Sequence, residues 1–183
     1  MPVLLSLDLA GRVGWACGAP GGSPSFGVLS LPQDAGLGRL LDDYDRWLTR
    51  TILDRSVTTI LFESPILRAK RTHPLTARRL MSLAGLTELA AHLLKLDIWE
   101  ASTLPVTKFF CGAARFKTGR GPAADREAKK AAVIAECHRR GWNAQDDDMA
   151  DALALFAYAE AKIFSIARDR GFVSREAMAR GLA

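Results

Sequence analysis

Hydrophobic positions along the chain follow two patterns, short continuous apolar runs and longer stretches with helical spacing. Apolar runs bounded by turns or acidic residues indicate strands buried within a sheet. The predicted strands are residues 3–7, 13–17, 25–31, 58–62 and 97–101. A loop rich in glycine and proline at 18–24 separates the second strand from the third, so we expect the first three strands to form a meander.

The stretches between the strands have the spacing of amphipathic helices. Apolar residues recur every three or four positions from Leu37 to Ile52, which is typical of one buried helix face. Further helices are predicted over 74–94, 104–111, 125–140 and 147–167, with a glycine-rich basic loop at 112–122. This order predicts an α/β fold, a mixed five-stranded sheet flanked by helices. We expect one domain over 1–170 and a short helical extension over 171–183.

Composition places the chain among ordinary globular proteins. It has 183 residues, of which 49% are hydrophobic and 25% charged, enough for a core that needs no disulfides. The three cysteines, Cys17, Cys111 and Cys137, are odd in number and far apart in sequence, which argues against a disulfide framework or a zinc cluster and favours a reducing compartment. No apolar stretch reaches the roughly 18 residues of a membrane span, and no basic leader precedes the first apolar run.

Positive charge is concentrated in two tracts. The formal net charge is +5, but residues 64–87 carry five basic residues and no acid, and residues 104–130 carry seven basic residues against two acids. Two separate basic tracts favour an extended polyanion such as a nucleic acid as partner. Solvated helix faces that keep the protein soluble are the alternative interpretation.

Two acidic residues lie at the ends of predicted interior strands, where removing a carboxylate from water costs free energy. Asp8 closes the apolar run at 3–7, and Glu63 closes the run at 58–62. If these strands are parallel neighbours, the two carboxylates lie side by side at the edge where α/β sheets bind ligands. Anions that close destabilise each other unless they are protonated or bridged by a cation. A turn residue is the alternative for either acid alone.

A second pair of acids, Asp148 and Asp151, is three positions apart on a predicted helix and therefore shares one face. Four hard oxygen ligands without a His or Cys set suit Mg²⁺ or Mn²⁺, and such a cluster is what two-metal phosphoryl chemistry requires. Helix capping also explains acids here, and we expect Asp146 to be the N-cap. Asp147 replaces Asp148 as the ligand if the helix register differs by one.

Three segments in order, residues 5–16 (LSLDLAGRVGWA), 61–65 (LFESP) and 148–155 (DMADALAL), are similar to the motifs of the RuvC-type Holliday-junction resolvases, in the ribonuclease-H-like superfamily. The resemblance spans about residues 3–160 and fits a divergent or phage-like member. It implies a homodimer that nicks branched DNA, most simply four-way junctions, in a Mg²⁺-dependent reaction. It also implies a bacterial or phage-encoded protein of the cytoplasm, associated with the nucleoid.

Site residues follow from the same resemblance. Asp8, Glu63, Asp148 and Asp151 are expected to hold two Mg²⁺ ions per site, with Mn²⁺ as a substitute, and Lys129 to stabilise the charged transition state. A wedge residue against the junction would be Ile66 or Leu67. We expect the loop at 112–122 to be mobile and to order on DNA. The expected contacts to the DNA backbone are Arg68, Lys70, Arg71, Arg78, Arg79, Lys108, Arg115, Lys117, Arg120 and Lys130.

Three other functions compete with this hypothesis. The chain could be a ribonuclease-H-like nuclease acting on RNA–DNA hybrid, flap or structured RNA, or a non-catalytic nucleic-acid-binding module. The segment from Asp8 to Gly11 also resembles the first phosphate loop of sugar kinases and actin-like ATPases. Those proteins close two lobes over a nucleotide, and 183 residues leave no room for the second lobe. We therefore expect no nucleotide cofactor.

Overall fold

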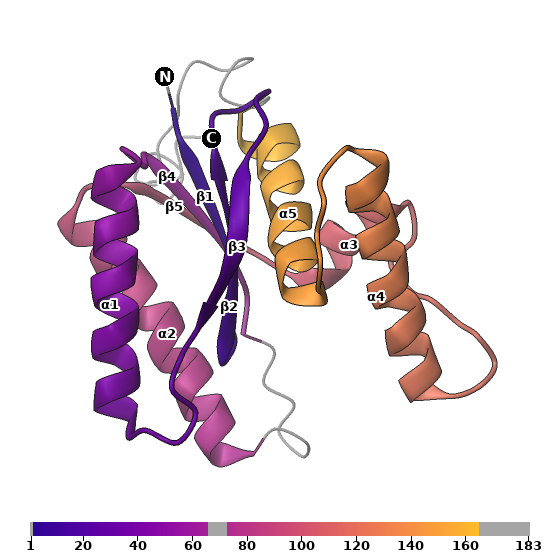
Figure 1. Cartoon of the computed structure of the whole chain (residues 1–183), viewed down its shortest axis with the longest axis horizontal. Helices are drawn as coiled ribbons and strands as arrows, with labels where there is room; N and C mark the ends of the chain where they lie inside the picture. The colour runs from indigo at the N-terminus through magenta and orange to yellow at the C-terminus, as the bar shows by residue number, and fades with distance from the viewer. Residues whose placement is uncertain (1, 66–72, 165–183) are drawn as a thin grey trace, which may run out of the picture.

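The computed structural model describes residues 2–65 and 73–164 and shows a five-stranded sheet with helices on both faces (Figure 1). The strands are β1 (Leu4–Asp8), β2 (Arg12–Gly18), β3 (Ser25–Ser30), β4 (Thr59–Glu63) and β5 (Asp97–Ala101). Their order in the sheet is β3-β2-β1-β4-β5. The first three strands are antiparallel, whereas β4 and β5 run parallel to β1. The predicted meander and mixed sheet are therefore confirmed.

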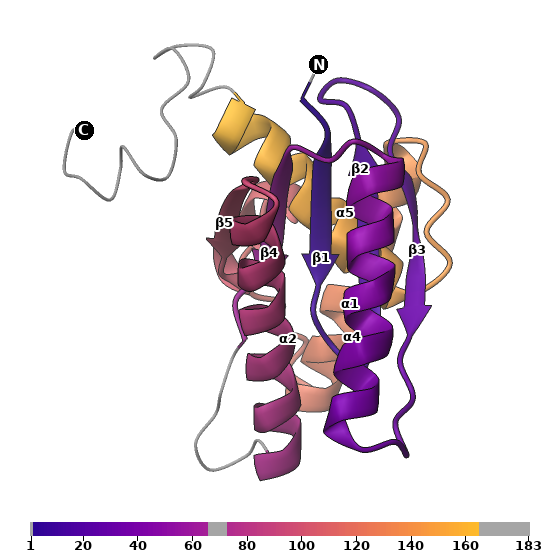
Figure 2. The same cartoon turned by 90° about the vertical axis from the view of Figure 1, so that its left-hand side faces the viewer.

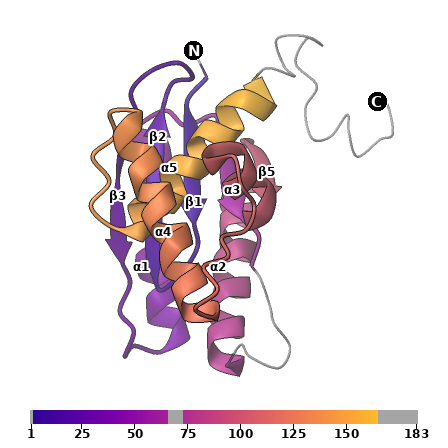
Figure 3. The same cartoon turned by 90° about the vertical axis from the view of Figure 1, so that its right-hand side faces the viewer.

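Helices cover both faces of the sheet (Figures 1, 2 and 3). One face carries α1 (Leu37–Asp54) and α2 (Pro74–Leu93), and the other carries α3 (Thr103–Cys111), α4 (Pro122–Arg139) and α5 (Asp147–Ala159). No helix in the described ranges is long and apolar enough to cross a membrane.

One predicted helix start was wrong. Helix α4 begins at Pro122 rather than at residue 125, because proline is well suited to the first turn of a helix, where its missing N–H costs no hydrogen bond. Helix α5 covers Asp147–Ala159 and continues as a π-helical turn over Glu160–Phe164, and the predicted end near residue 167 lies outside the described residues. The predicted extension at 171–183 lies outside the described residues.

Strand β1 is buried on both faces because its side chains alternate between two cores. Leu5 and Leu7 pack into the core shared with α1 and α2, whereas Leu4 lies in the core formed with α5. Ser6 faces α5 as well, and its hydroxyl donates a 2.8 Å hydrogen bond to the carbonyl oxygen of Ala152. The sheet and α5 are thus joined at the centre of the molecule.

The ends of two parallel strands and the starts of three helices lie toward the same end of the molecule (Figures 1 and 2). Strands β1 and β4 are parallel, so both end there, and helices α2, α4 and α5 begin there. The N-termini of three helices, which carry partial positive charge, therefore lie toward the same end of the molecule as the carboxyl ends of β1 and β4 (Figure 1).

Candidate carboxylate site

Asp8 and Glu63 lie next to each other at the end of the sheet. Asp8 is the last residue of β1 and Glu63 the last of β4, and they follow the paired residues Leu7 and Phe62 of the parallel ladder. Both side chains are partly buried. The expectation that the two acids end neighbouring parallel strands is confirmed.

The first turn of α5 lies directly beside these strand ends. Gly14 of β2 pairs with Asp8, and a Cβ atom built on Gly14 would be only 2.0 Å from the carbonyl oxygen of Asp148. Only glycine allows the helix backbone to approach this closely. This approach brings Asp148 and Asp151, both partly buried, toward the acids of β1 and β4.

The four acids act on one another electrostatically, and we call Asp8, Glu63, Asp148 and Asp151 the carboxylate cluster. Burial raises the pKa of Asp8 well above its ordinary value of 3.8, and the charges of the other three cluster members raise it further, while Lys129 opposes them. Burial also raises the pKa of the other three cluster acids. Without a bound cation, the ionised forms of these four acids are therefore destabilised relative to their protonated forms.

Two cluster members, Glu63 and Asp151, have polar partners on α3 and α4. The hydroxyl of Thr103 donates a short hydrogen bond to Glu63, which opposes the rise of its pKa. Lys129 Nζ lies 3.5 Å from the Oδ1 atom of Asp151. The side chain of Lys129 is only 26% exposed, so this predicted catalytic lysine lies against the cluster.

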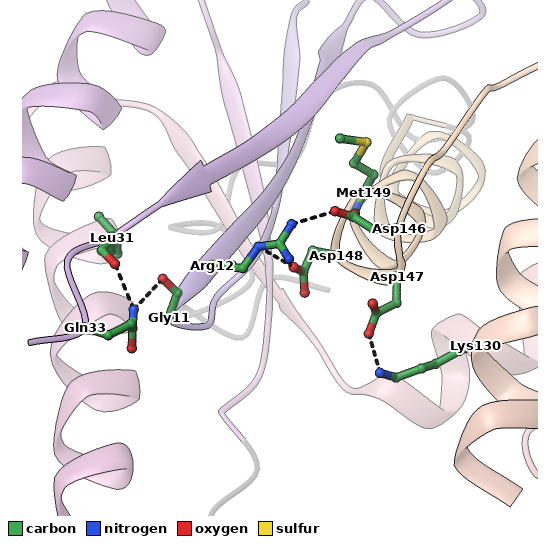
Figure 4. Close-up of polar contacts among 9 residues, drawn as sticks. All are labelled: Gly11, Arg12, Leu31, Gln33, Lys130, Asp146, Asp147, Asp148 and Met149. Carbon is green, nitrogen blue, oxygen red and sulfur yellow. Dashed lines mark hydrogen bonds and ion pairs between the residues drawn. The ribbon is translucent and has the colours of Figure 1, made fainter. Parts of the chain in front are cut away.

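Arg12, the first residue of β2, contacts two aspartates at the start of α5 (Figure 4). Its Nη2 atom is 2.6 Å from Oδ2 of Asp146, and its Nε atom is 3.2 Å from Oδ2 of Asp148. The guanidinium opposes the burial that raises the pKa of Asp148. Arg12 is thus a cation at the edge of the cluster.

The three consecutive aspartates before and at the start of α5 have different roles (Figure 4). Asp146 is the N-cap, as expected, because its side chain accepts a 2.9 Å hydrogen bond from the backbone N–H of Met149. Asp147 pairs with Lys130 at 2.6 Å, and this hydrogen bond lowers the pKa of Asp147. Asp148, rather than Asp147, acts on the charge of Asp8. The geometry therefore favours Asp148 as the cluster member.

The donor atoms suit a hard divalent cation, but the side chains do not enclose one as they stand. Among the described residues, no three His, Cys, Asp or Glu side chains form a group that could hold a metal ion. Asp148 is held by Arg12, Asp151 by Lys129 and Glu63 by Thr103. Carboxylate oxygens are nevertheless the preferred ligands of Mg²⁺, and a cation would relieve the mutual repulsion that raises the pKa of Asp8. The residues fit a divalent ion in chemistry, and binding needs side-chain rotation.

The predicted DNA contacts of the first basic tract divide into two groups. Arg68, Lys70 and Arg71 lie outside the described residues, as do both wedge candidates, Ile66 and Leu67. Arg78 is exposed. Arg79 instead donates hydrogen bonds to the carbonyl oxygens of Gln33 at 2.8 Å and Ala35 at 3.3 Å, so it holds α2 to the segment between β3 and α1.

The basic loop before α4 makes polar contacts with the first turn of that helix, and its mobility stays a prediction. Asp125 in the first turn of α4 accepts hydrogen bonds from both the backbone N–H and the hydroxyl of Thr118, at 2.7 and 3.0 Å. Lys117 lies 3.4 Å from the same carboxylate. All five predicted DNA contacts of this region are exposed, namely Lys108, Arg115, Lys117, Arg120 and Lys130. Three of them, Arg115, Lys117 and Arg120, belong to the loop itself.

The sequence analysis missed Arg12, Gly14 and Thr103 as parts of this site. Arg12 and Gly14 belong to the first motif, but a basic residue and a glycine after a strand have no distinctive spacing of their own. Thr103 follows β5 at the same end of the sheet as Glu63, so the topological argument applied to Asp8 and Glu63 would have found it.

No protein-family model and no curated protein matches this chain. Several solved structures do match it. Thermus thermophilus RuvC in complex with a Holliday junction substrate has a TM-score of 0.64 and 13% identity, over 93% of this chain and 97% of that one. A second structure of Thermus thermophilus RuvC has a TM-score of 0.62 and 13% sequence identity, over 91% of this chain and 95% of that one. The yeast mitochondrial Holliday junction resolvase Ydc2 has a TM-score of 0.56 and 12% sequence identity, over 88% of this chain and 80% of that one. The chain therefore has the fold of RuvC and Ydc2.

Proposed function

We propose that this protein is a metal-dependent endonuclease that hydrolyses phosphodiester bonds in branched DNA, with the four-way junction as its substrate. The observation that carries the proposal is the carboxylate cluster, in which burial and then the charges of three further acids raise the pKa of Asp8 well above its ordinary value. Repelling, partly buried acids destabilise a fold, and perturbed carboxylates of this kind concentrate at functional sites. The four acids come from β1, β4 and α5, so capping of one helix does not account for them.

The four cluster acids would hold two Mg²⁺ ions, or Mn²⁺ in their place. When bound, such ions supply a nucleophilic water at neutral pH and stabilise the departing oxygen. The chain itself positions the donors: Thr103 orients Glu63 through its hydroxyl, and the packing of α5 on Gly14 fixes Asp148. Lys129 stands beside Asp151, where its charge is available to a phosphate during the reaction.

Two observations support branched DNA as the substrate class: the surface charge of this chain and the solved structures that share its fold. One RuvC neighbour is described as a complex with a Holliday junction, and Ydc2 is described as a Holliday junction resolvase. In this chain, the exposed cations Lys108, Arg115 and Arg120 belong to α3 and the loop that leads to the start of α4. The N-termini of α2, α4 and α5, at the end of the molecule where β1 and β4 end (Figure 1), also attract phosphates. These groups contact backbones and read no bases.

Symmetric resolution of a junction needs two cuts, and each chain has one carboxylate cluster. We therefore propose a homodimer with two-fold symmetry. Size-exclusion chromatography with light scattering, run on the protein alone and with a synthetic junction, measures this directly. A monomer in both samples would contradict the dimer.

The central experiment is a cleavage assay on an immobile four-way junction in Mg²⁺, with duplex, flap and RNA–DNA hybrid substrates in parallel. We expect the wild type to nick the junction, and Asp8→Asn and Asp151→Asn to lose at least about 10²-fold in rate while still binding it. The matched control is Asp43→Asn, which removes an acid paired with Arg39 on the surface of α1 and should cut normally.

Two outcomes would redirect the proposal. Faster cutting of the RNA–DNA hybrid would favour a ribonuclease-H-like activity on hybrids. Junction binding that is unchanged in Asp8→Asn, with no nicking by the wild type in Mg²⁺ or Mn²⁺, would indicate a non-catalytic binding module.

A further inference from the structure

Arg12 is held between two aspartates by contacts of unequal length. The contact to Asp146 is 2.6 Å and the contact to Asp148 is 3.2 Å. Asp146 is the N-cap of α5 and lies outside the carboxylate cluster, whereas Asp148 belongs to it. One guanidinium therefore joins a purely structural acid to a proposed metal ligand.

The longer of these contacts is also the one that a cation would have to replace. The Oδ2 atom of Asp148 points at Arg12 (Figure 4), and no group of three described side chains can hold a metal ion as they stand. The Arg12 side chain is 54% exposed, so it can move without opening the core. Its shorter bond to Asp146 would keep the guanidinium at the start of α5 after Asp148 turns away.

We infer that Arg12 is a positioning residue that occupies Asp148 in the cation-free protein and competes with the incoming divalent ion for that carboxylate. This inference rests on the proposed function, because it assumes that the cluster binds a divalent ion. Once Asp148 is released, Arg12 remains on Asp146 with one edge of its guanidinium unpaired, at the border of the cluster. A phosphate oxygen of the substrate is the group that such a donor binds best.

A merely structural role for Arg12 predicts the opposite effect on cation binding. If Arg12 only held α5 against β2, its loss would loosen Asp148 and weaken cation binding. If Arg12 competes for Asp148, its loss frees a ligand and strengthens cation binding. Both roles lower the stability of the cation-free protein, so stability alone does not distinguish them.

The test measures Mn²⁺ binding to the full-length protein by electron paramagnetic resonance of the free ion, without DNA. Arg12→Gln should lower the Kd for Mn²⁺ about three- to fivefold, the range expected when a half-exposed ion pair no longer competes. In the Asp148→Asn background the same substitution should change the Kd by less than about 1.5-fold, because the competition acts through that carboxylate. A charge effect through space would persist in both backgrounds.

The matched control is Arg46→Gln, which removes a cation paired with Asp42 on the surface of α1. It should leave the Kd for Mn²⁺ within about twofold of the wild type. Weaker or unchanged binding in Arg12→Gln, or equal tightening by Arg46→Gln, would overturn the inference and leave the nuclease proposal intact. Absence of Mn²⁺ binding by the wild type would overturn both.

Discussion

Replacement of Gly14 by alanine tests whether the close approach of α5 to β2 sets the geometry of the cluster. The added Cβ would lie 2.0 Å from the carbonyl oxygen of Asp148 and 2.6 Å from its carbonyl carbon. Ordinary van der Waals contact begins near 3.4 Å, so the first turn of α5 must move by about 1.4 Å. Both atoms in the way belong to backbone, so no side-chain rotation relieves the clash.

The expected cost is about 1–3 kcal/mol of unfolding free energy, as for other overpacked cores. A displacement of about 1 Å in a catalytic group lowers rates by about 10²-fold, and Asp148 and Asp151 move with the helix. Urea unfolding followed by tryptophan fluorescence measures the first effect, and junction cleavage measures the second.

Gly85→Ala is the control, because a Cβ at that exposed position of α2 meets nothing within 4 Å. This variant should keep full cleavage and gain up to about 1 kcal/mol from higher helix propensity. If Gly14→Ala has the stability and the cleavage rate of the wild type, the proposed dependence of the cluster on this contact is wrong.

Three further predictions concern charge. Asp8 has a raised pKa in the folded protein, so its protonated form stabilises the fold below pH 3.8 and this contribution is lost as the pH rises through the folded pKa. Asp8→Asn should therefore flatten the pH dependence of urea unfolding in EDTA and stabilise the cation-free protein at pH 7. Thr103→Val removes the hydroxyl that opposes the raised pKa of Glu63, so the Kd for Mn²⁺ should rise by up to about tenfold at pH 7, whereas Thr103→Ser should retain tight binding. Arg115→Ala and Arg120→Ala, at exposed positions, should each reduce the slope of log affinity for junction DNA against log salt by about 0.9, as measured by fluorescence anisotropy.

The sequence predicted those parts of the fold that depend on local periodicity. The apolar runs ending at Asp8 and Glu63 located β1 and β4 because strands buried on both faces leave a continuous apolar signature. The sequence analysis expected those two acids to lie side by side if the strands are parallel neighbours, and the register shows that they are. The start of α4 was misplaced because polar and small residues around Pro122 carry no apolar periodicity.

The parts of the site that were missed depend on contacts between residues far apart in sequence. Arg12 and Asp146 are separated by 134 positions, and no spacing rule connects an arginine at the start of a strand with a helix cap in the last third of the chain. The role of Gly14 has the same origin, because a glycine in a strand is unremarkable until the helix packed on it is known.

The packing of α5 on β1 and β2 holds the cluster carboxylates close together, whereas their charges repel one another. Ser6 joins β1 to α5 through Ala152, and Gly14 lets the same helix approach β2 to backbone contact. These contacts hold the acids of α5 near Asp8 and Glu63, so the carboxylates cannot separate to relieve their repulsion. A fold selected for stability alone would have relaxed either the packing or the acids. In the proposed function, binding of a divalent cation offsets the free-energy cost of this arrangement, and the close packing of α5 holds the acids in place for it.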